Sequence, residues 1–266
     1  MPELPEVQTV VSGIQPIVGS TITDVTVNFP KLRKPLQKDL ASELSGAKII
    51  SITRRAKFIV IKTHVDLIIH LGMSGKLTLQ ELNYQPIKHD HVIFHLADKL
   101  LVYNDPRRFG MVSWHTCTTD LLAHYGIEPL SKAFNAEYLK NYTHKKTTPI
   151  KNLIMDQRCV VGVGNIYVCE ALFHAHIKPD LPAHSLSKEQ CKQLVTCIKQ
   201  VLDQAIQQGG TTLKDYRTAS DTMGYFQQRL YVYGREGQPC LKCTTPIINL
   251  KLSGRSTFYC PECQSL

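Results

Sequence analysis

The sequence predicts an α+β protein of several domains: a β-sandwich with a flanking helix, then a helical domain, then a zinc-binding ribbon. Three observations lead to this fold class. Short segments typical of strands dominate residues 1–115, helical periodicity replaces them after about Trp114, and two C-x2-C pairs stand near the C-terminus. We expect domains at residues 1–115, 131–229 and 230–266, with a transition at residues 116–130.

The N-terminal domain is expected to begin with a helix and to continue as a sandwich. Apolar residues recur every three or four positions over residues 3–18, and Pro2 suits the start of a helix. Five β-rich segments follow, separated by Gly, Pro and Asn/Asp turns, and their number favours an antiparallel sandwich or a flattened barrel. These segments are residues 21–27, 48–62, 66–79, 91–96 and 100–103.

The middle of the chain carries the helical pattern. The last of its helices has clear ends, because Ser187 and Gln190 have the spacing of a capping box and Gly209-Gly210 is a typical helix stop. The expected helices are residues 120–125, 136–142, 150–155, 166–174 and 187–208.

Four cysteines near the C-terminus have the spacing of a structural zinc site. Two C-x2-C pairs, separated by residues 244–259, can supply four sulfur ligands in a tetrahedron, which leaves no open position for catalysis. The sequence therefore predicts one structural Zn²⁺ as the cofactor. Its ligands are Cys240, Cys243, Cys260 and Cys263.

Between the two cysteine pairs, residues 247–252 and 256–259 alternate like the strands of a hairpin. Ser253, Gly254 and Arg255 fill the expected turn. Arg255 is either an ordinary solvated turn residue or, held rigidly at the tip, a clamp for a phosphate group.

Composition and charge indicate a soluble protein with an affinity for polyanions. Lys and Arg outnumber Asp and Glu by 31 to 22, for a formal net charge of +9, but charge alone does not separate a nucleic-acid-binding protein from a merely basic one. No apolar run reaches the roughly 18 residues of a membrane span. The absence of a secretory signal and the odd count of 9 cysteines favour the cytoplasm.

A glycine-containing turn in the helical region is a candidate phosphate site. Gly162 and Gly164 precede Asn165, which is placed to cap the next helix, so main-chain amides can approach an anion at the positive end of that helix. The same pattern also fits a simple turn. Lys146 and Lys151 nearby favour phosphate binding.

The N-terminal sequence offers a nucleophile. If the initiator methionine is removed, Pro2 becomes a secondary amine, and an α-amino group has a pKa of about 7.7–8.0. Its attack on a sugar carbon gives an iminium, which is the electron sink that β-elimination needs. Glu3 is the adjacent acid/base. The alternative is a helix start with acidic residues in its first turn.

Several motifs, in this order along the chain, resemble formamidopyrimidine-DNA glycosylases over essentially the whole length. The four-cysteine ribbon is the last of them. The others are Pro2-Glu-Leu-Pro-Glu-Val7, Arg54-Arg-Ala-Lys57, His70-Leu-Gly-Met-Ser-Gly75, Asp105-Pro-Arg-Arg-Phe-Gly110 and Val161-Gly-Val-Gly-Asn-Ile-Tyr167.

The resemblance implies a β-sandwich, a helix-two-turn-helix domain and a zinc finger, with DNA held between them. It implies that Pro2 is the Schiff-base nucleophile, that Glu3 is the proton donor, and that Lys57 assists strand cleavage. Asn165 and Arg255 match the phosphate clamps of the helical motif and the finger, and Arg255 also matches a role in the second elimination. Further expected DNA contacts are His89, Arg107 and Lys146 or Lys151.

The family flips its target base out of the duplex and fills the hole that is left. Met73, Arg107 and Phe109 match the inserted residues, although Met73 and Phe109, taken singly, are more typical of a core. Residues 214–226 resemble the loop that closes over the flipped base. Gln8 departs from the family, because many relatives have an acid there, and Thr222-Met223 departs from the loop composition.

The function implied is a bifunctional glycosylase and abasic-site lyase for oxidised purines in duplex DNA, acting as a monomer. One alternative is the sister class for oxidised pyrimidines, endonuclease VIII. That class typically has Gly where Leu4 stands and lacks the Met73, Arg107 and Phe109 pattern. The other alternative is a zinc protein that binds DNA without catalysis, which leaves Pro2 and Glu3 unexplained.

Overall fold

The computed structural model describes residues 2–117, 122–210 and 230–265. The chain divides into two compact units. One contains Met1–Ala123 and Gln208–Tyr225, and the other contains His124–Gln207 and Phe226–Leu266. The expected base-covering loop, residues 214–226, lies outside the described residues. No helix within the described ranges is long and apolar enough to cross a membrane.

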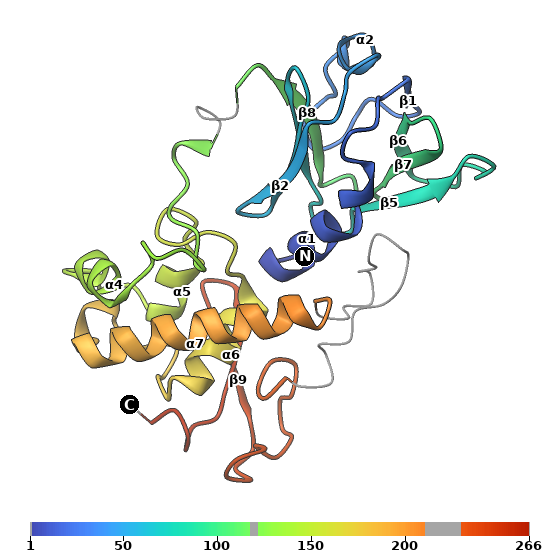
Figure 1. Cartoon of the computed structure of the whole chain (residues 1–266). Coiled ribbons are helices and arrows are strands. Elements are labelled where there is room, and N and C mark those ends of the chain that lie inside the picture. The colour runs from blue at the N-terminus through green and yellow to red at the C-terminus, as the bar shows by residue number, and fades with distance from the viewer. Residues whose placement is uncertain (1, 118–121, 211–229, 266) are drawn as a thin grey trace. The chain divides into compact units, whose positions relative to one another are not determined.

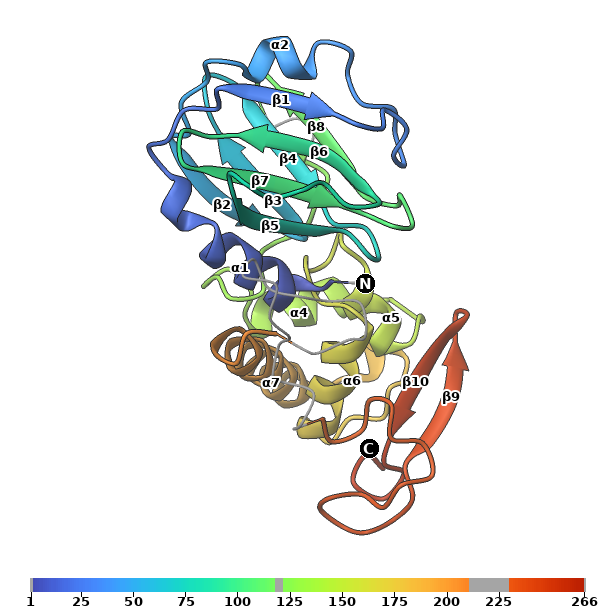
Figure 2. The ribbon, with the colours of Figure 1, turned by 90° about the vertical axis from the view of Figure 1, so that its right-hand side faces the viewer.

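The first unit contains two four-stranded sheets, and every neighbouring pair of strands is antiparallel. Figure 2 shows one sheet in front of the other, as in a sandwich. In spatial order the first sheet is β1 (Asp24–Val27), β6 (Asp90–His95), β7 (Lys99–Asn104) and β5 (Lys76–Glu81). The second is β2 (Ser51–Arg55), β3 (Phe58–Lys62), β4 (Asp66–His70) and β8 (Met111–His115).

The core of this unit is formed by apolar side chains of both sheets. Ile59 and Ile61 alternate along β3, and Phe94 of β6 and Tyr103 of β7 belong to the same buried cluster. Side chains at every second position of a strand share one face, which explains why these β-branched and aromatic residues meet in one layer.

Helix α1 (Leu4–Gly13) packs on β2 and β3 through its buried apolar face. The sequence predicted one helix over residues 3–18. The structure instead ends α1 at Gly13 and adds the short 3-10 helix η1 (Gln15–Ile17). Pro16 accounts for the break, because it lacks a main-chain donor and its ring would clash with the carbonyl group of Ser12 if the α-helix continued.

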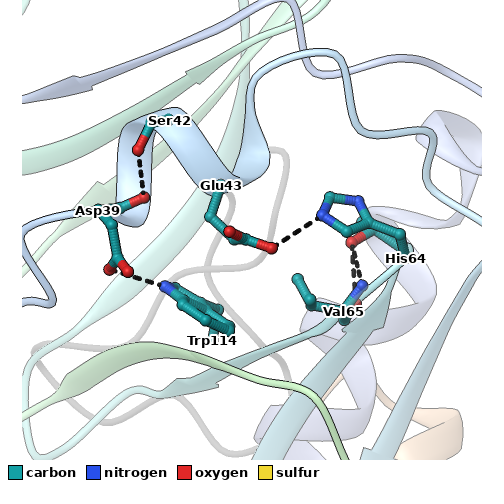
Figure 3. Close-up of polar contacts among 7 residues, drawn as sticks. Asp39, Ser42, Glu43, His64, Val65 and Trp114 are labelled. Atoms are coloured by element: carbon teal, nitrogen blue, oxygen red, sulfur yellow. Dashed lines mark hydrogen bonds and ion pairs between the residues drawn. The ribbon is translucent and has the colours of Figure 1, made fainter.

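Helix α2 (Leu40–Leu44) and α1 lie at opposite ends of the sandwich (Figure 2). Polar contacts join α2 to β8 and to the β3–β4 turn, as Figure 3 shows. The indole nitrogen of Trp114 donates to Asp39 at 3.1 Å, and His64 Nε2 lies 3.0 Å from Glu43 Oε1. Helix α2 was not predicted, because five residues are too few for a helical period to be visible.

The second unit contains the helices α4 (Ala136–Thr143), α5 (Ile150–Met155), α6 (Asn165–His174) and α7 (Lys188–Gln207), together with the 3-10 helix η2 (Ala183–Ser185) (Figure 1). Helix α6 is buried along almost its whole length, and α7 buries one face. The predicted capping box of α7 is confirmed: Ser187 N donates to Gln190 Oε1 at 2.8 Å, and Gln190 N donates to Ser187 Oγ at 3.1 Å.

The C-terminal hairpin consists of β9 (Ile248–Leu252) and β10 (Arg255–Tyr259). Arg255 pairs with Leu252, so the turn contains only Ser253 and Gly254. Both have positive φ angles, 47° and 76°, which suits a two-residue hairpin turn. The three-residue turn expected from the sequence was therefore wrong, and Arg255 is the first residue of β10.

The strands are more numerous than the sequence predicted. The segments expected at residues 48–62 and 66–79 are each divided, into β2 and β3 and into β4 and β5. The first division is a two-residue turn, Ala56-Lys57, since Arg55 pairs with Phe58. Strand β8 was missed, because its apolar residues are interrupted by Ser113 and followed by polar sequence.

Candidate active site and nucleic-acid interface

The N-terminal segment is held in place by Glu6. Pro2 and Glu3 are both buried, and Glu3 has an extended backbone directly before α1. The main-chain nitrogen of Glu3 donates to Glu6 Oε2 at 2.8 Å, and Glu6 itself is fully buried. The Glu6 carboxylate therefore orients the two residues proposed for chemistry. Glu6 was not predicted from the sequence, although an acid three residues after a helix start is a capping signal.

Lys57 lies in the β2–β3 turn rather than within a strand, and only 8% of it is exposed. Ala56 before it has a φ of 54°, a conformation that costs a residue with a Cβ atom about 1–2 kcal/mol. Arg54 stabilises the turn, because Nη1 donates to Ala56 O at 2.9 Å while Nε donates to Gln8 Oε1 at 3.1 Å. Arg54 thus connects α1 to the turn that carries Lys57.

His70, at the end of β4, is neutral at physiological pH. Burial, followed by the positive charges of Lys57 and Arg33, lowers the pKa of His70 to about 4, while Asp105 acts in the opposite direction. Nδ1 accepts a hydrogen bond from Gly72 N at 3.0 Å, which assigns the ring proton to Nε2. In the sequence, His70 begins the family-like motif of residues 70–75, and no separate role was expected for it.

The three residues expected to fill the DNA stack lie on two adjacent loops. Met73 is 39% exposed and Phe109 is 45% exposed, which excludes both from the core. The guanidinium carbon of Arg107 lies 4.9 Å from the centre of the Phe109 ring. The loops touch through their backbones, since a methyl group at Gly72 would lie 2.5 Å from Gly110 N.

His89 lies beside the same loops. Its main-chain oxygen accepts from Asp105 N at 3.1 Å, and its φ of 76° turns the chain at this point. The structure therefore brings together the loops that carry His89, Met73, Arg107 and Phe109, although they are well separated in the sequence.

In the second unit, the glycine turn differs from the expectation. Gly164, not Asn165, is the cap residue of α6, and Asn165 is the first helical residue. Gly162 N donates to Gln157 Oε1 at 2.8 Å, so this amide is engaged within the protein. Asn165 Nδ2 donates to Ser256 O of β10 at 2.9 Å. The Asn165 side chain thus connects α6 to the hairpin that carries Arg255.

Lys151 does not lie where a phosphate contact would. We expected a phosphate contact, but Lys151 is fully buried. Its ammonium group donates to Thr257 Oγ1 at 2.7 Å and to Ser256 O at 3.2 Å. It therefore supports β10 from α5 instead of reaching a ligand. Lys146 is exposed and remains the candidate for the phosphate contact.

The tip of the hairpin is fixed by a second contact from α5. Asn152 Nδ2 donates to Ser253 Oγ at 2.8 Å. Arg255, next to this turn, is exposed. Its backbone is thus held from α5 and α6 while its guanidinium group faces solvent, as a phosphate clamp would require.

The four cysteines form a compact group that fits a structural zinc. Their sulfur atoms all lie within 4.8 Å of one another. Lys242 N and Cys263 N each lie 3.4 Å from a cysteine sulfur, as main-chain donors that support thiolates. Four sulfur donors without a free position suit Zn²⁺ in a structural role, and the thiolates of Cys240, Cys243, Cys260 and Cys263 would hold it.

Comparison with known proteins covers both units. Residues 1–112 match the family model of the formamidopyrimidine-DNA glycosylase N-terminal domain, and residues 125–217 match that of the formamidopyrimidine-DNA glycosylase H2TH domain. Residues 237–266 match a zinc finger found in FPG and IleRS. A formamidopyrimidine-DNA glycosylase of Methylobacillus flagellatus is 47% identical, over 99% of this chain and 96% of its own length.

The chain belongs to the formamidopyrimidine-DNA glycosylase family.

Solved structures of the family agree with this assignment. A Lactococcus lactis FPG mutant, in a complex with Fapy-dG-containing DNA, is 34% identical with a TM-score of 0.92, and the match covers all of both chains. Lactococcus lactis Fpg in a complex with abasic-site-containing DNA is 33% identical, also with a TM-score of 0.92, over 99% of this chain and 100% of that chain.

One further residue of this glycosylase-family chain was not predicted from the sequence. Glu170 of α6 is 2% exposed, and its carboxylate accepts hydrogen bonds from the main-chain nitrogens of Tyr231, Val232 and Tyr233 at 2.8–3.0 Å. It fixes the segment that leads into the zinc finger. A glutamate within an otherwise apolar helix was the available signal, since a buried charge needs partners.

Proposed function

We propose that this protein removes oxidised purines, chiefly 8-oxoguanine and ring-opened formamidopyrimidines, from duplex DNA and then cleaves the strand at the abasic site. The observation that carries the proposal is the family match over both units, in a chain that keeps Pro2, Glu3 and the Met73, Arg107 and Phe109 group. The two Lactococcus lactis structures contain, by their descriptions, a Fapy-dG lesion and an abasic site.

The chemistry begins at Pro2 once Met1 has been removed. The secondary amine forms a bond to C1′ of the damaged nucleotide, the glycosidic bond breaks, and the base leaves with the bonding electrons and a proton. The C1′–O4′ bond then breaks as O4′ takes up a proton, which gives the iminium. Loss of a C2′ proton to water sends the C–H electrons into this iminium, and the bond from C3′ to the phosphate oxygen breaks in β-elimination with the phosphate as leaving group. Glu3 donates a proton during opening of the sugar.

Positive groups assist the eliminations. Lys57 is fixed in the β2–β3 turn and, unlike Lys151, keeps part of its surface exposed, so it contacts the phosphate beside the reacting sugar. Arg255 binds phosphate and assists the second, δ-elimination. Asn165 and Lys146 act as further phosphate contacts, and His89 binds DNA close to Arg107.

The flipped base leaves a hole that Met73, Arg107 and Phe109 fill. Apolar Met73 and Phe109 replace lost stacking, and the Arg107 guanidinium hydrogen-bonds the orphaned base. The exposure of Met73 and Phe109 supports this role, since water contact by large apolar side chains has a cost that binding to DNA relieves.

All proposed reactive groups come from one chain, so we expect a monomer on damaged DNA. Activity on DNA agrees with the cytoplasmic location expected from the sequence. The test of substrate class compares single-turnover excision from two duplexes, one with 8-oxoguanine and one with thymine glycol. We expect faster excision of 8-oxoguanine. A preference for thymine glycol would assign the chain to the sister activity, and excision of neither would contradict the proposal.

A further inference from the structure

Asp105 is a fully buried acid that the chemistry above does not use. It directly follows β7, and both oxygens of its carboxylate accept hydrogen bonds. Oδ1 accepts from Ser74 Oγ at 2.7 Å, while Oδ2 accepts from Gly110 N at 2.8 Å and from Tyr103 Oη at 3.3 Å. A buried carboxylate is costly without such partners, so these donors determine where the loops around it lie.

The partners of this carboxylate are the sequence neighbours of the residues that fill the DNA stack. Ser74 follows Met73, and Gly110 follows Phe109. Ser74 Oγ also accepts from Arg107 N at 3.2 Å. One carboxylate and one hydroxyl therefore connect the backbones beside all three inserted side chains.

The same two loops are in direct backbone contact, which leaves little freedom for adjustment. A methyl group at Gly72 would lie 2.5 Å from Gly110 N and from Phe109 C. A methyl group at Gly110 would overlap the Tyr103 hydroxyl. The main chain of Asp105 is fixed as well, since its oxygen lies 2.8 Å from His91 Nε2 and accepts from Arg108 N at 3.1 Å.

Rigid support matters because insertion into DNA orders side chains, and ordering them in advance reduces the entropic cost of binding. Asp105 and Ser74 are both buried, so neither reaches the duplex in this conformation. We propose that Asp105 and Ser74 are positioning residues that hold the Met73 loop and the Arg107–Phe109 loop in the arrangement needed to fill the space left by a flipped base. This inference rests on the proposed glycosylase function.

Two activities of the full-length protein separate this role from a general structural one. Excision of 8-oxoguanine from duplex DNA requires the base to be flipped and the hole to be filled. Strand cleavage at a preformed abasic site in single-stranded DNA requires neither. A variant with misplaced loops should therefore lose the first activity and keep the second.

Ser74→Ala is the principal variant, because it removes the link between Asp105 and Arg107 without changing any charge near Lys57 and His70. Ser113→Ala, in β8, is the matched control: it removes a hydroxyl that lies 3.1 Å from His115 Nε2 in the same unit. Asp105→Asn is the second variant, which keeps the shape of the side chain but places an amide group where a carboxylate oxygen accepts a hydrogen bond.

We expect Ser74→Ala to slow single-turnover excision from the duplex about tenfold, equivalent to about 1.4 kcal/mol, with cleavage of the single-stranded abasic site within about twofold of the wild type. Asp105→Asn should show the same split, and Ser113→Ala should change neither activity. In a Met73→Ala background, Ser74→Ala should slow excision less than it does in the wild type, because one of the three side chains that it positions is already absent.

Wild-type duplex excision by Ser74→Ala would overturn the inference, as would an equal loss of both activities in a variant that melts at the wild-type temperature. If Ser74→Ala does not fold, the split must appear in Asp105→Asn, and its absence there overturns the inference. A wild-type protein without 8-oxoguanine excision would instead contradict the proposed function, so the two failures are distinguishable.

Discussion

Replacement of Lys151 by methionine tests the conclusion that the zinc hairpin is held from inside the helical unit. Lys151→Met keeps the length of the side chain and removes the ammonium group that contacts Thr257 and Ser256. Hydrogen bonds to a charged group contribute about 1.5–3 kcal/mol each. Burial of an ammonium group costs several kcal/mol in return. The two effects nearly cancel, so we expect the free energy of unfolding to change by no more than about 2 kcal/mol.

The effect on DNA binding should be larger than this small change in stability suggests. Strand β10 would lose the hydrogen bonds from Lys151, although Asn165 would still hold Ser256 and Asn152 would still hold Ser253. Arg255 would then sample more positions. We expect about tenfold weaker binding to a duplex with an abasic-site analogue, equivalent to about 1.4 kcal/mol, measured by fluorescence anisotropy.

The salt dependence and a double-mutant cycle identify the cause. The slope of log K against log salt is negative, and loss of a direct phosphate contact reduces its magnitude by about 0.9. Arg255→Gln should show this reduction. In that background, Lys151→Met should have almost no further effect, since the two residues act through one contact. Lys199→Met is the control, because Lys199 donates to Ser131 O away from the hairpin. Full additivity of Lys151→Met and Arg255→Gln, or unchanged binding by Lys151→Met, would refute the reasoning.

Three other predictions follow from buried or metal-binding groups. Glu170→Gln should lower the free energy of unfolding, measured in denaturant titrations, by about 1–3 kcal/mol, since an amide cannot accept all three main-chain hydrogen bonds. Glu189→Gln, at an exposed position, is the control and should have little effect. Equal effects of the two substitutions would contradict this prediction. Burial lowers the pKa of His70 from 6.5 to about 4, so between these pH values the folded chain binds fewer protons than the unfolded chain. The contribution of His70 to the free energy of unfolding should therefore be fully present above about pH 6.5 and fall by up to about 3 kcal/mol towards pH 4. His70→Asn should show a smaller fall, and an identical pH profile would disprove the assignment. Removal of zinc by a chelator should abolish DNA binding, because the metal stabilises the finger. The fluorescence of the single tryptophan, Trp114 in β8 of the sandwich, should stay unchanged. DNA binding by zinc-free protein would contradict a role of the finger.

Much of the fold could be predicted because its signals are local. Short β-rich segments between turn residues indicated the strands of the sandwich, alternation indicated the hairpin, and Ser187 with Gln190 indicated the start of α7. Spacing alone identified the zinc ligands. The errors arose where a turn is determined by pairing: Arg55 pairs with Phe58, and Arg255 pairs with Leu252, and neither partnership is visible in a single strand.

The site was predicted less completely, because burial depends on contacts between distant segments. Lys151 has the sequence context of a surface phosphate contact, and only its approach to Thr257 shows that it is internal. Asp105 and Glu170 were overlooked for the same reason, since their donors come from other loops. The residues assigned from family motifs, such as Pro2 and Met73, stay predictions until they are tested.

The central claim, that the N-terminal amine carries out base excision, is tested most directly by borohydride trapping. Protein whose mass confirms removal of Met1 is mixed with a duplex that contains 8-oxoguanine, then reduced and digested. We predict a covalent adduct in which the DNA fragment is attached to the peptide that begins at Pro2. Excision of the lesion without any adduct, or an adduct at another residue, would contradict it.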